Sequence, residues 1–391
     1  MDQKYDVIII GAGPAGTITA KKCREKGLSV LVLEKRPEIG SPKRCAEGIM
    51  HDDLKRLGYT GKESFVAQRI DAGIIYSPGG KSVEIHGSAF GYVLERKVFD
   101  KTLAYEAAKH GAKIYTKAEV FDLIKSDGII SGVRVIYNGE QKNIHGRIIV
   151  SAEGVESKIS QLAGLKAGNT PKSVDSGYQY EMAGIKINPR MTCFYFGNEI
   201  APEGYIWIFP KGEHIANVGI ALGGSSKKTS KYYLDRWIDS KPEIKKGSII
   251  EENSGGIPIG AFMESMTLDN FLAIGDAAHQ VNPLHGGGLA ESSHAAQIAA
   301  DVIVDAIKSN DTSNKKLDRY NKMWWEKRGK ALKNVEKVVI VIRKLSDSDL
   351  DMIVSSFKWD DLYDIVEGRI QKLLKVFIKN PRLATLVKHL R

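Results

Sequence analysis

The sequence YDVIIIGAGPAG, residues 5–16, joins an apolar run to a glycine motif close to the N-terminus. Branched apolar residues in a run of this length are typical of a buried parallel strand. In the motif G-x-G-x-x-G, Gly11 permits a tight turn, Gly13 lets the backbone approach a pyrophosphate, and Gly16 lets the next helix pack on the strand. The pyrophosphate would bind the free N–H groups of that helix. The stretch therefore predicts a dinucleotide site.

The residues that follow the motif support this interpretation. Residues 15–26 have helical character, and residues 29–33 form a second apolar run that ends at Glu34. An acid at this distance from the motif is suited to bind a ribose hydroxyl. The alternative is a glycine-rich turn in an ordinary α/β protein, and the full context of the motif argues against it.

Composition places the chain among soluble globular proteins. It has 391 residues, enough for two or three domains, with 42% hydrophobic and 27% charged residues. We expect no signal peptide, because the first strand begins near Lys4, and no apolar run is long enough to span a bilayer. Three scattered cysteines (Cys23, Cys45, Cys193) predict neither a disulfide framework nor a metal site. A reducing, cytoplasmic setting fits best.

The net charge of +10 indicates an anionic partner. Nucleic acid and an anionic membrane surface are the two candidates. No helix-turn-helix, zinc-finger or RNP-type motif occurs, so we expect no nucleic acid partner. Residues 368–391 contain seven Lys or Arg, no Asp or Glu, and interleaved apolar residues. This region is either a solvated helix packed on its own domain or a helix that contacts a membrane surface.

A second motif on the nucleotide side lies at residues 271–288, FLAIGDAAHQVNPLHGGG. Its apolar run ends beside Asp276, an acid that can accept hydrogen bonds from sugar or ribityl hydroxyls. Three glycines then open a helix whose bare N-terminus favours negative charge, such as that of a reduced flavin near N1 and C2. The alternative is a glycine-rich connection. Between the two motifs, residues 174–260 contain many short β-type runs, which predict an antiparallel sheet.

At this point the sequence resembles a known family. GAGPAG with Glu34, Arg96 within YVLERKVFD, and GDAAHQVNPLHGGG are similar to the two-domain flavoproteins related to p-hydroxybenzoate hydroxylase. KRPEIGSPKRCAEG (residues 35–48) and YIWIFPKGEHIANVG (residues 205–219) resemble the geranylgeranyl reductase branch. Within that branch the resemblance is to the archaeal-type digeranylgeranylglycerophospholipid reductases, and it covers essentially the whole chain.

The resemblance implies an α/β fold: a Rossmann-like FAD-binding domain, an inserted antiparallel β-sheet substrate domain and a helical C-terminal region. We expect the FAD-binding domain to comprise residues 1–60, 90–170 and 265–325. The β domain would comprise residues 61–89 and 171–264, and the helical region residues 326–391.

FAD is the cofactor that the resemblance implies, through contacts that include the backbone of both glycine motifs. Three positions depart from the pattern of many relatives: Glu153 replaces Asp, Ala46 replaces Gly, and His285 replaces a small polar residue. The expected cofactor contacts are Gly11, Gly13, Ala15, Gly16, Glu34, Cys45, Ala46, Gly48, Arg96, Val120, Asp276, Gly287, Gly288 and Leu289.

The implied substrate carries isolated trisubstituted alkenes, which have no carbonyl to polarise them. Reduced FAD can deliver hydride from N5, and a protein acid or water can supply the proton. Cys45 is the first catalytic candidate, because Lys43 and Arg44 beside it would favour the thiolate; the alternative is a small residue that only packs against the cofactor. His285 is the second candidate. It is either an acid–base residue or a residue with only a structural role before the helix.

An aromatic strand supplies the expected substrate site. Tyr205, Trp207 and Phe209 alternate and therefore face one side of the sheet, where they could line a prenyl tunnel or form an ordinary sheet core. Met182, Phe194 and Phe196 are candidate extensions of this wall. Lys211, which Gly212 follows, could meet a lipid phosphate or could be a solvated loop lysine.

The resemblance implies a flavin-dependent reductase that saturates the geranylgeranyl chains of prenylated glycerophospholipids, and the aromatic strand and the Cys45 loop are in keeping with it. The electron donor would be a ferredoxin-like protein, a deazaflavin or NAD(P)H, and the enzyme would be cytoplasmic and peripheral at the membrane surface. Two alternatives remain: a flavin monooxygenase that acts on a small aromatic compound, and a prenyl-lipid escort of the same fold without catalysis.

Overall fold

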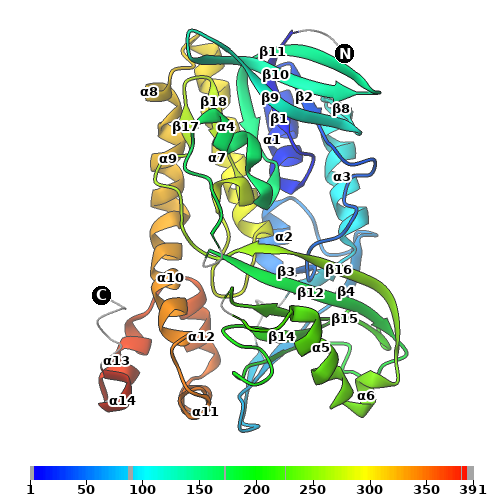
Figure 1. Ribbon diagram of the computed structural model, residues 1–391, viewed down its shortest axis with the longest axis vertical. Helices are drawn as coiled ribbons and strands as arrows, with labels where there is room; N and C mark the ends of the chain where they lie inside the picture. The colour runs from blue at the N-terminus through cyan, green and yellow to red at the C-terminus, as the bar shows by residue number, and fades with distance from the viewer. Residues whose placement is uncertain (1–3, 87–90, 171–172, 225, 380, 385–391) are drawn as a thin grey trace.

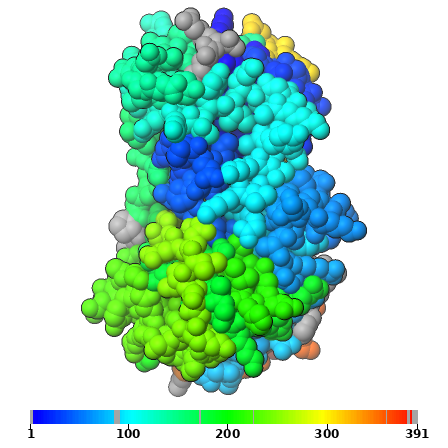
Figure 2. Space-filling model, turned by 90° about the vertical axis from the view of Figure 1, so that its right-hand side faces the viewer, coloured from blue at the N-terminus to red at the C-terminus, as the bar shows by residue number. Residues whose placement is uncertain are grey.

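A computed structural model of the protein describes residues 4–86, 91–170, 173–224, 226–379 and 381–384. Figure 1 shows one sheet with its helices at the upper end, a second sheet at the lower end, and a helical column along one side. In Figure 2 the two ends meet at a waist, where the blue N-terminal segment reaches the surface. The architecture is the predicted α/β fold with a helical C-terminal region.

The first sheet is built around the buried strand β1 (Lys4–Ile10), in which Val7, Ile8 and Ile9 are fully buried. Its parallel neighbours on both sides explain why the strand is apolar throughout. The order of the main path is β17 (Thr267–Leu268), β18 (Phe271–Ala273), β11 (Glu140–Ser151), β1, β2 (Val30–Leu33) and β8 (Lys113–Tyr115), and β10 (Ile129–Tyr137) and β9 (Ala118–Ser126) extend it from β11.

Three long helices pack together beside this sheet: α1 (Pro14–Glu25), α3 (Arg96–Lys109) and α7 (Leu289–Lys308). Helix α1 starts at a proline. Proline has no backbone N–H, and the first helical position needs none, because an N–H there has no partner within the helix. Small buried residues of α7, among them Ala295 and Ala299, allow close packing. The short helix α4 (Lys158–Ala163) follows β11.

The second sheet has seven strands, and one of its faces is covered by α5 (Ser230–Asp239) and α6 (Pro242–Lys245). Trp237 of α5 belongs to one core cluster with Ile206 and Ile208, so Tyr205, Trp207 and Phe209 must face the other side. All pairings are antiparallel except β13 with β5. The order is β16 (Ser248–Pro258), β12 (Val174–Ala183), β15 (Ile215–Leu222), β14 (Tyr205–Pro210), β13 (Met191–Tyr195), β5 (Ala72–Tyr76) and β6 (Ser82–His86).

A small third sheet contains β3 (Gly48–Met50), β7 (Gly91–Leu94) and β4 (Val66–Arg69). Helix α2 (His51–Arg56) packs on β3 and β7. Strands β5 and β6 come from the earlier segment expected for the β domain, whereas β4 pairs with β7 instead. The domain boundaries themselves stay a prediction.

The C-terminal part is helical, as predicted. Among the residues that the structure describes, no helix combines the length and apolar character needed to cross a membrane. Residues 380 and 385–391 of the basic C-terminal segment lie outside the described residues. The helices are α8 (Asn314–Leu317), α9 (Arg319–Trp324), a π-helical turn (Trp325–Gly329), α10 (Lys330–Ile342), α11 (Asp347–Ser356), α12 (Trp359–Val366), α13 (Gln371–Lys379) and α14 (Pro381–Ala384).

Candidate functional site

The glycine turn after β1 is closely packed at two positions and open at the third. A Cβ at Gly11, where φ is +103°, would lie 2.3 Å from the carbonyl oxygen of Ala152, and one at Gly16 would lie 2.1 Å from that of Gly11. A Cβ at Gly13 would meet no protein atom within 4 Å. The open space at Gly13 is where a pyrophosphate could approach the N-terminus of α1.

Glu34 directly follows β2 and lies at the same edge of the sheet as the glycine turn. Its carboxylate accepts hydrogen bonds from the N–H groups of Ala12 and Arg36, both at 2.9 Å. The Glu34 carbonyl accepts the N–H of Ala118 at 2.9 Å, which brings the start of β9, and with it the buried Val120, to this edge. Glu34, which is predicted to bind the ribose, and Val120 therefore lie at the same end of the sheet.

The second glycine motif meets the first. A Cβ at Gly275 would lie 3.0 Å from the Cβ of Ala15, and one at Gly288 would lie 2.9 Å from Oδ1 of Asp276. Burial raises the pKa of Asp276, and the charges of Arg96 and His279 offset only part of this rise. Gly288 precedes α7, whose first residue, Leu289, is buried. The backbone of this turn and Asp276 could thus hold the middle of an extended cofactor.

Arg96 and Cys45 are brought together although 51 positions separate them in the sequence. Arg96 forms a bidentate ion pair with Asp100, with N–O distances of 2.8 and 2.9 Å. Its guanidinium also forms a hydrogen bond with the Cys45 side chain. The Cys45 Sγ atom accepts the N–H of Glu47 at 3.2 Å.

The basic neighbours of Cys45 in the sequence are directed elsewhere. Lys43 is buried among carboxylates, with its Nζ atom 2.5 Å from Glu181, and Arg44 pairs with Glu156 at 3.3 Å. The expectation that Lys43 and Arg44 act on the thiol is therefore wrong. Arg96 contacts the thiol instead, and only the tertiary structure brings it to Cys45.

The predicted aromatic wall faces the FAD-binding side of the molecule. The Tyr205 hydroxyl donates to the carbonyl of His285 at 2.8 Å, and the Phe209 ring packs so closely on Gly48 that a Cβ there would lie 2.8 Å from it. Trp207 is buried and donates to Gln179 at 3.0 Å. We call Tyr205, Trp207 and Phe209, with the ring contacts that Phe194 and Phe196 add to them, the aromatic wall.

One expected extension of the aromatic wall lies elsewhere. Met182 belongs to the core cluster that packs beneath α5, together with Tyr180. The physical reason is strand alternation on β12, where residues 180 and 182 face that core and Gln179 and Glu181 face the opposite side.

A cleft begins at the aromatic wall and is open to solvent. Phe196, Tyr205, Leu284, Ile342 and Leu350 contribute apolar and aromatic lining. The cleft also contains an ion pair in which Nη2 of Arg343 lies 2.7 and 2.8 Å from the carboxylate oxygens of Asp175. It connects the aromatic wall to helices α10 and α11.

The ring of His285 is exposed, and its Nδ1 atom accepts the N–H of Gly287 at 3.1 Å. Surrounding protein lowers the pKa of His285 to about 4, with desolvation as the largest cause. Water still reaches the ring and limits this shift, but its direction leaves the imidazole neutral at pH 7.

We expect that His285 is not the proton donor at neutral pH. Because its pKa lies well below the ordinary value of 6.5, the ring is already deprotonated throughout the neutral pH range. His285→Gln should therefore leave the shape of the pH–rate profile between pH 6 and 8 unchanged. A profile of kcat with an ionisation near pH 6.5 that disappears in the variant would contradict this prediction.

Lys211 and Gly212 form the turn after β14. Lys211 is buried, and its Nζ atom lies 2.8, 3.0 and 2.9 Å from carboxylates of Glu95, Glu47 and Glu181. A lipid phosphate would have to displace these partners. Gly212 is half-buried, and a Cβ there would lie 3.0 Å from Ile215.

Four polar residues around this turn were missed by the sequence analysis: Glu47, Gln179, Glu181 and Asn217. All four are buried. They form hydrogen bonds within or to the segment that carries Cys45, or accept one from Lys211. The available signal was the occurrence of polar residues at inward positions of apolar strands, as with Asn217 in IANVGIAL.

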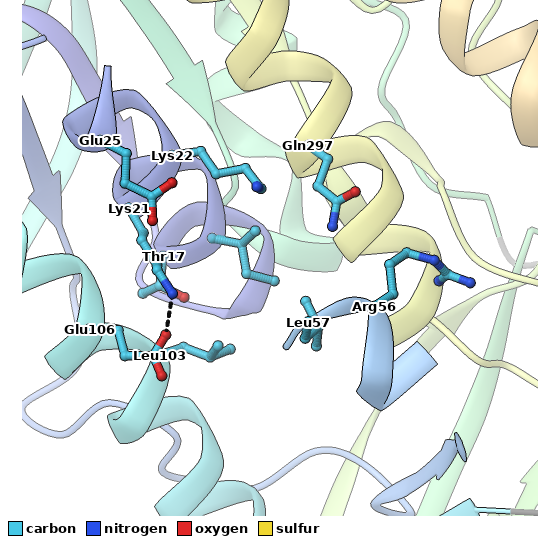
Figure 3. Close-up of a pocket in the computed structure, with 10 residues that line it drawn as sticks. Thr17, Lys21, Lys22, Glu25, Arg56, Leu57, Leu103, Glu106 and Gln297 are labelled. Carbon is cyan, nitrogen blue, oxygen red and sulfur yellow. Dashed lines mark hydrogen bonds and ion pairs between the residues drawn. The ribbon is translucent and has the colours of Figure 1, made fainter. Parts of the chain in front are cut away.

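A separate surface pocket lies between α1, α2, α3 and α7 (Figure 3). Lys21 and Glu106 pair across it at 2.7 Å, and Lys22, Glu25 and Arg56 add further charges. Its lining includes none of the predicted site residues, so it is distinct from the glycine turns and the aromatic wall.

The residues present fit FAD. An open glycine turn, an acid at the end of β2, and Asp276 beside Gly288 lie in the order that an extended dinucleotide requires. Arg96 and Cys45 adjoin the aromatic wall through the loop that ends at Gly48.

Comparison with known proteins agrees with this geometry. Residues 4–200 match the family of FAD binding domains, and residues 173–257 match the geranylgeranyl reductase catalytic domain. The chain is 40% identical to a digeranylgeranylglycerophospholipid reductase of Methanosarcina acetivorans over 92% of this chain and 89% of the relative. A reductase of the same name from Methanocaldococcus jannaschii is 39% identical, over 96% of this chain and 98% of the relative.

A solved structure supports the same assignment. A geranylgeranyl bacteriochlorophyll reductase-like protein from Thermoplasma acidophilum is 35% identical and superposes with a TM-score of 0.91, covering 98% of this chain and 99% of that one. The two family matches together cover residues 4–257, and the relatives and the solved structure extend the similarity to at least 92% of the chain. The protein belongs to the geranylgeranyl reductase family of FAD-dependent oxidoreductases.

Proposed function

We propose that the protein reduces the C=C bonds of geranylgeranyl chains in digeranylgeranylglycerophospholipids. The observation that carries the proposal is the aromatic wall, which packs on the Cys45–Gly48 loop of the FAD-binding side and continues into a cleft whose lining is largely apolar and aromatic, with the Asp175–Arg343 ion pair in it. The similarity to reductases named for this substrate supports it. A long apolar chain needs such a lining, whereas a small polar aromatic compound does not.

In this proposal the cofactor, the aromatic wall and Cys45 each have a separate role. Reduced FAD, when bound, supplies the hydride. The aromatic wall orients the prenyl chain and excludes water from the alkene. Cys45, which lies next to Arg96, is our candidate for the group that holds the proton at its Sγ atom, with water as the alternative donor.

The test uses the purified FAD-loaded protein, reduced anaerobically with dithionite. Digeranylgeranylglyceryl phosphate is then added, and its mass is followed for stepwise gain of hydrogen. A flavin that reduces while the lipid mass stays constant would overturn the proposal. NAD(P)H-stimulated oxygen uptake with a small aromatic compound would favour a monooxygenase, and a colourless protein that takes up no FAD would favour an escort.

Cys45→Ser should slow lipid reduction by at least about tenfold, because the weakly acidic hydroxyl is a poorer proton donor. The affinity for FAD should change by no more than about twofold, because a hydroxyl fits the same space. Single-turnover oxidation of the reduced flavin by lipid, compared with FAD titration, measures both. Equal losses would assign Cys45 to cofactor contact alone.

The electron donor is also part of the proposal: a ferredoxin-like protein, a deazaflavin or NAD(P)H. We propose to compare the three as reductants of the bound flavin under anaerobic conditions. The donor that reduces the flavin fast enough to sustain lipid turnover is the physiological class.

We further propose that the enzyme works in the cytoplasm, at the membrane surface, through helix α13. Its apolar residues Leu373 and Phe377 pack inside the C-terminal core, whereas Lys375, Ile378 and Lys379 are exposed. Replacing Lys375 and Lys379 by Glu should weaken binding to anionic vesicles by about tenfold or more, since each basic residue near such a surface contributes about 1 kcal/mol. Cosedimentation measures this, and equal binding of both proteins would contradict it.

A further inference from the structure

The loop that carries Cys45 is held by side chains from the opposite sheet. Gln179 of β12 donates its amide N–H to the carbonyl of Cys45, and Asn217 of β15 donates to that of Ala46, both at 3.2 Å. Both amides are buried. The loop precedes the small sheet that begins at Gly48, so the contacts join two parts of the chain more than 130 residues apart.

Glu47 is the centre of this arrangement. It is fully buried and has a φ of +74°, a left-handed conformation that is uncommon for a residue with a side chain. One carboxylate oxygen accepts the N–H of Arg96 at 2.8 Å. The other lies 2.7 Å from the amide of Asn217, 3.0 Å from Nζ of Lys211 and 3.2 Å from Nζ of Lys43.

Two lysines meet four carboxylates at this point: besides the buried Glu47 and Glu181, the partly exposed Glu95 lies 2.8 Å from Lys211 and the partly exposed Glu251 lies 3.7 Å from Lys43. Lys43 and Lys211 both contact Glu181 as well, at 2.5 and 2.9 Å, so two lysines face two buried carboxylates. We call Lys43, Glu47, Glu181, Lys211 and Asn217 the charged cage. Burying such a network costs desolvation energy that an apolar core would avoid. We therefore infer that the network has a role other than stability.

The charged cage acts on two groups of the reaction site. The backbone N–H of Glu47 donates to Sγ of Cys45, and the Glu47 carboxylate holds the first residue of α3, Arg96, whose guanidinium contacts the same sulfur. The indole of Trp207 donates to the Gln179 amide, which in turn donates to the carbonyl of Cys45. The Gln179 side chain therefore links the aromatic wall to the loop.

We propose that Glu47 is a positioning residue, which fixes the Cys45 thiol and Arg96 against the aromatic wall. The value of this position for catalysis rests on the proposed function, whereas the position itself does not. A left-handed turn holds its conformation only when the surrounding contacts determine it, and the charged cage supplies those contacts.

The experiment measures alkylation of Cys45 by iodoacetamide in the FAD-loaded protein, followed by peptide mass spectrometry. Glu47→Gln should accelerate labelling about tenfold, the factor expected when a loop loses a charged hydrogen bond. In the lipid assay its kcat should fall while KM stays the same. Glu336→Gln is the matched control: Glu336 also accepts a backbone N–H and pairs with a lysine, but on α10, and its labelling rate should equal that of the unmodified protein.

A double variant separates position from charge balance. Glu47→Gln with Lys211→Met leaves Lys43 opposite Glu181, so thermal stability should recover. If labelling stays fast in the double variant, Glu47 positions the thiol; if it returns to the original rate, the charged cage is only a structural ion network and the proposal is overturned. Should Glu47→Gln fail to fold, Gln179→Met removes a contact to Cys45 without changing charge and should also accelerate labelling.

The two proposals fail separately. A protein that reduces no lipid, but in which Glu47→Gln accelerates labelling, would refute the proposed function and leave the positioning role intact. A protein that reduces lipid, and in which Glu47→Gln labels and turns over at the original rates, would refute the positioning role alone.

Discussion

Gly16→Ala should destabilise the FAD-binding end of the protein, whereas Gly13→Ala should leave it folded but without flavin. The new Cβ at residue 16 would lie 2.1 Å from the carbonyl oxygen of Gly11, a backbone atom that cannot move aside. We expect a loss of about 3 kcal/mol or more in the free energy of unfolding, at the upper end for overpacked sites. At Gly13 a Cβ meets no protein atom within 4 Å, so stability should be retained.

The Gly13 variant tests where the cofactor lies. A methyl group in the open space would occupy the approach of the pyrophosphate, so FAD affinity should fall about 100-fold or more, the loss expected when a bound group loses close backbone contacts. Chemical denaturation of the apoproteins and FAD titration measure the two effects. A Gly13→Ala protein that keeps its yellow colour at dilute FAD would place the pyrophosphate elsewhere.

Lys211→Met should destabilise the protein by about 3–5 kcal/mol, the usual cost of removing one partner from a buried ion pair. The side chain keeps its length, but Glu47 and Glu181 lose a cation at 3.0 and 2.9 Å. Lys97→Met is the matched control. Lys97 is only partly buried and pairs with Glu251 at the edge of the charged cage, so its loss should cost less than about 1 kcal/mol.

The effect of Lys211→Met should depend on pH in a stated direction. Burial raises the pKa of Glu181, but hydrogen bonds from Lys43 and Lys211 outweigh it, so the net pKa lies below its ordinary 4.5. A lowered carboxyl pKa stabilises the fold above the unfolded-state value and stops doing so as the pH falls through the folded-state value. The difference between the two proteins should therefore be largest at neutral pH and shrink below about pH 4.5. Denaturation at pH 7 and pH 4 measures it; a constant difference would contradict the role of the carboxylates.

Much of the fold could be predicted because its signals are local. The apolar run of β1, the turn at Gly11 and the proline that starts α1 lie within one short stretch. Strand alternation placed Tyr205, Trp207 and Phe209 on one face, and the core beneath α5 confirms that they share it. The same alternation rule would have put Met182 in the core, had the register of β12 been known.

The surroundings of Cys45 could not be predicted in the same way. Sequence neighbours suggested Lys43 and Arg44 as the charges near the thiol, yet Lys43 faces Glu181 and Arg44 faces Glu156. A side chain in a loop can point in any direction, so adjacency in the chain says little about contact. Arg96 reaches the thiol because α3 begins at the edge where the loop ends.

By itself the sequence determined the nucleotide-binding architecture, because that depends on short motifs whose residues act on their own neighbours, and its resemblance to known flavoproteins implied FAD and the family. Only the tertiary structure decided what surrounds the reacting groups. The contact of Lys43 with Asn217 spans 174 positions, and that of Glu47 with Asn217 spans 170. Such contacts follow from how two sheets meet, and a buried charge shows its role only when its partners are in place.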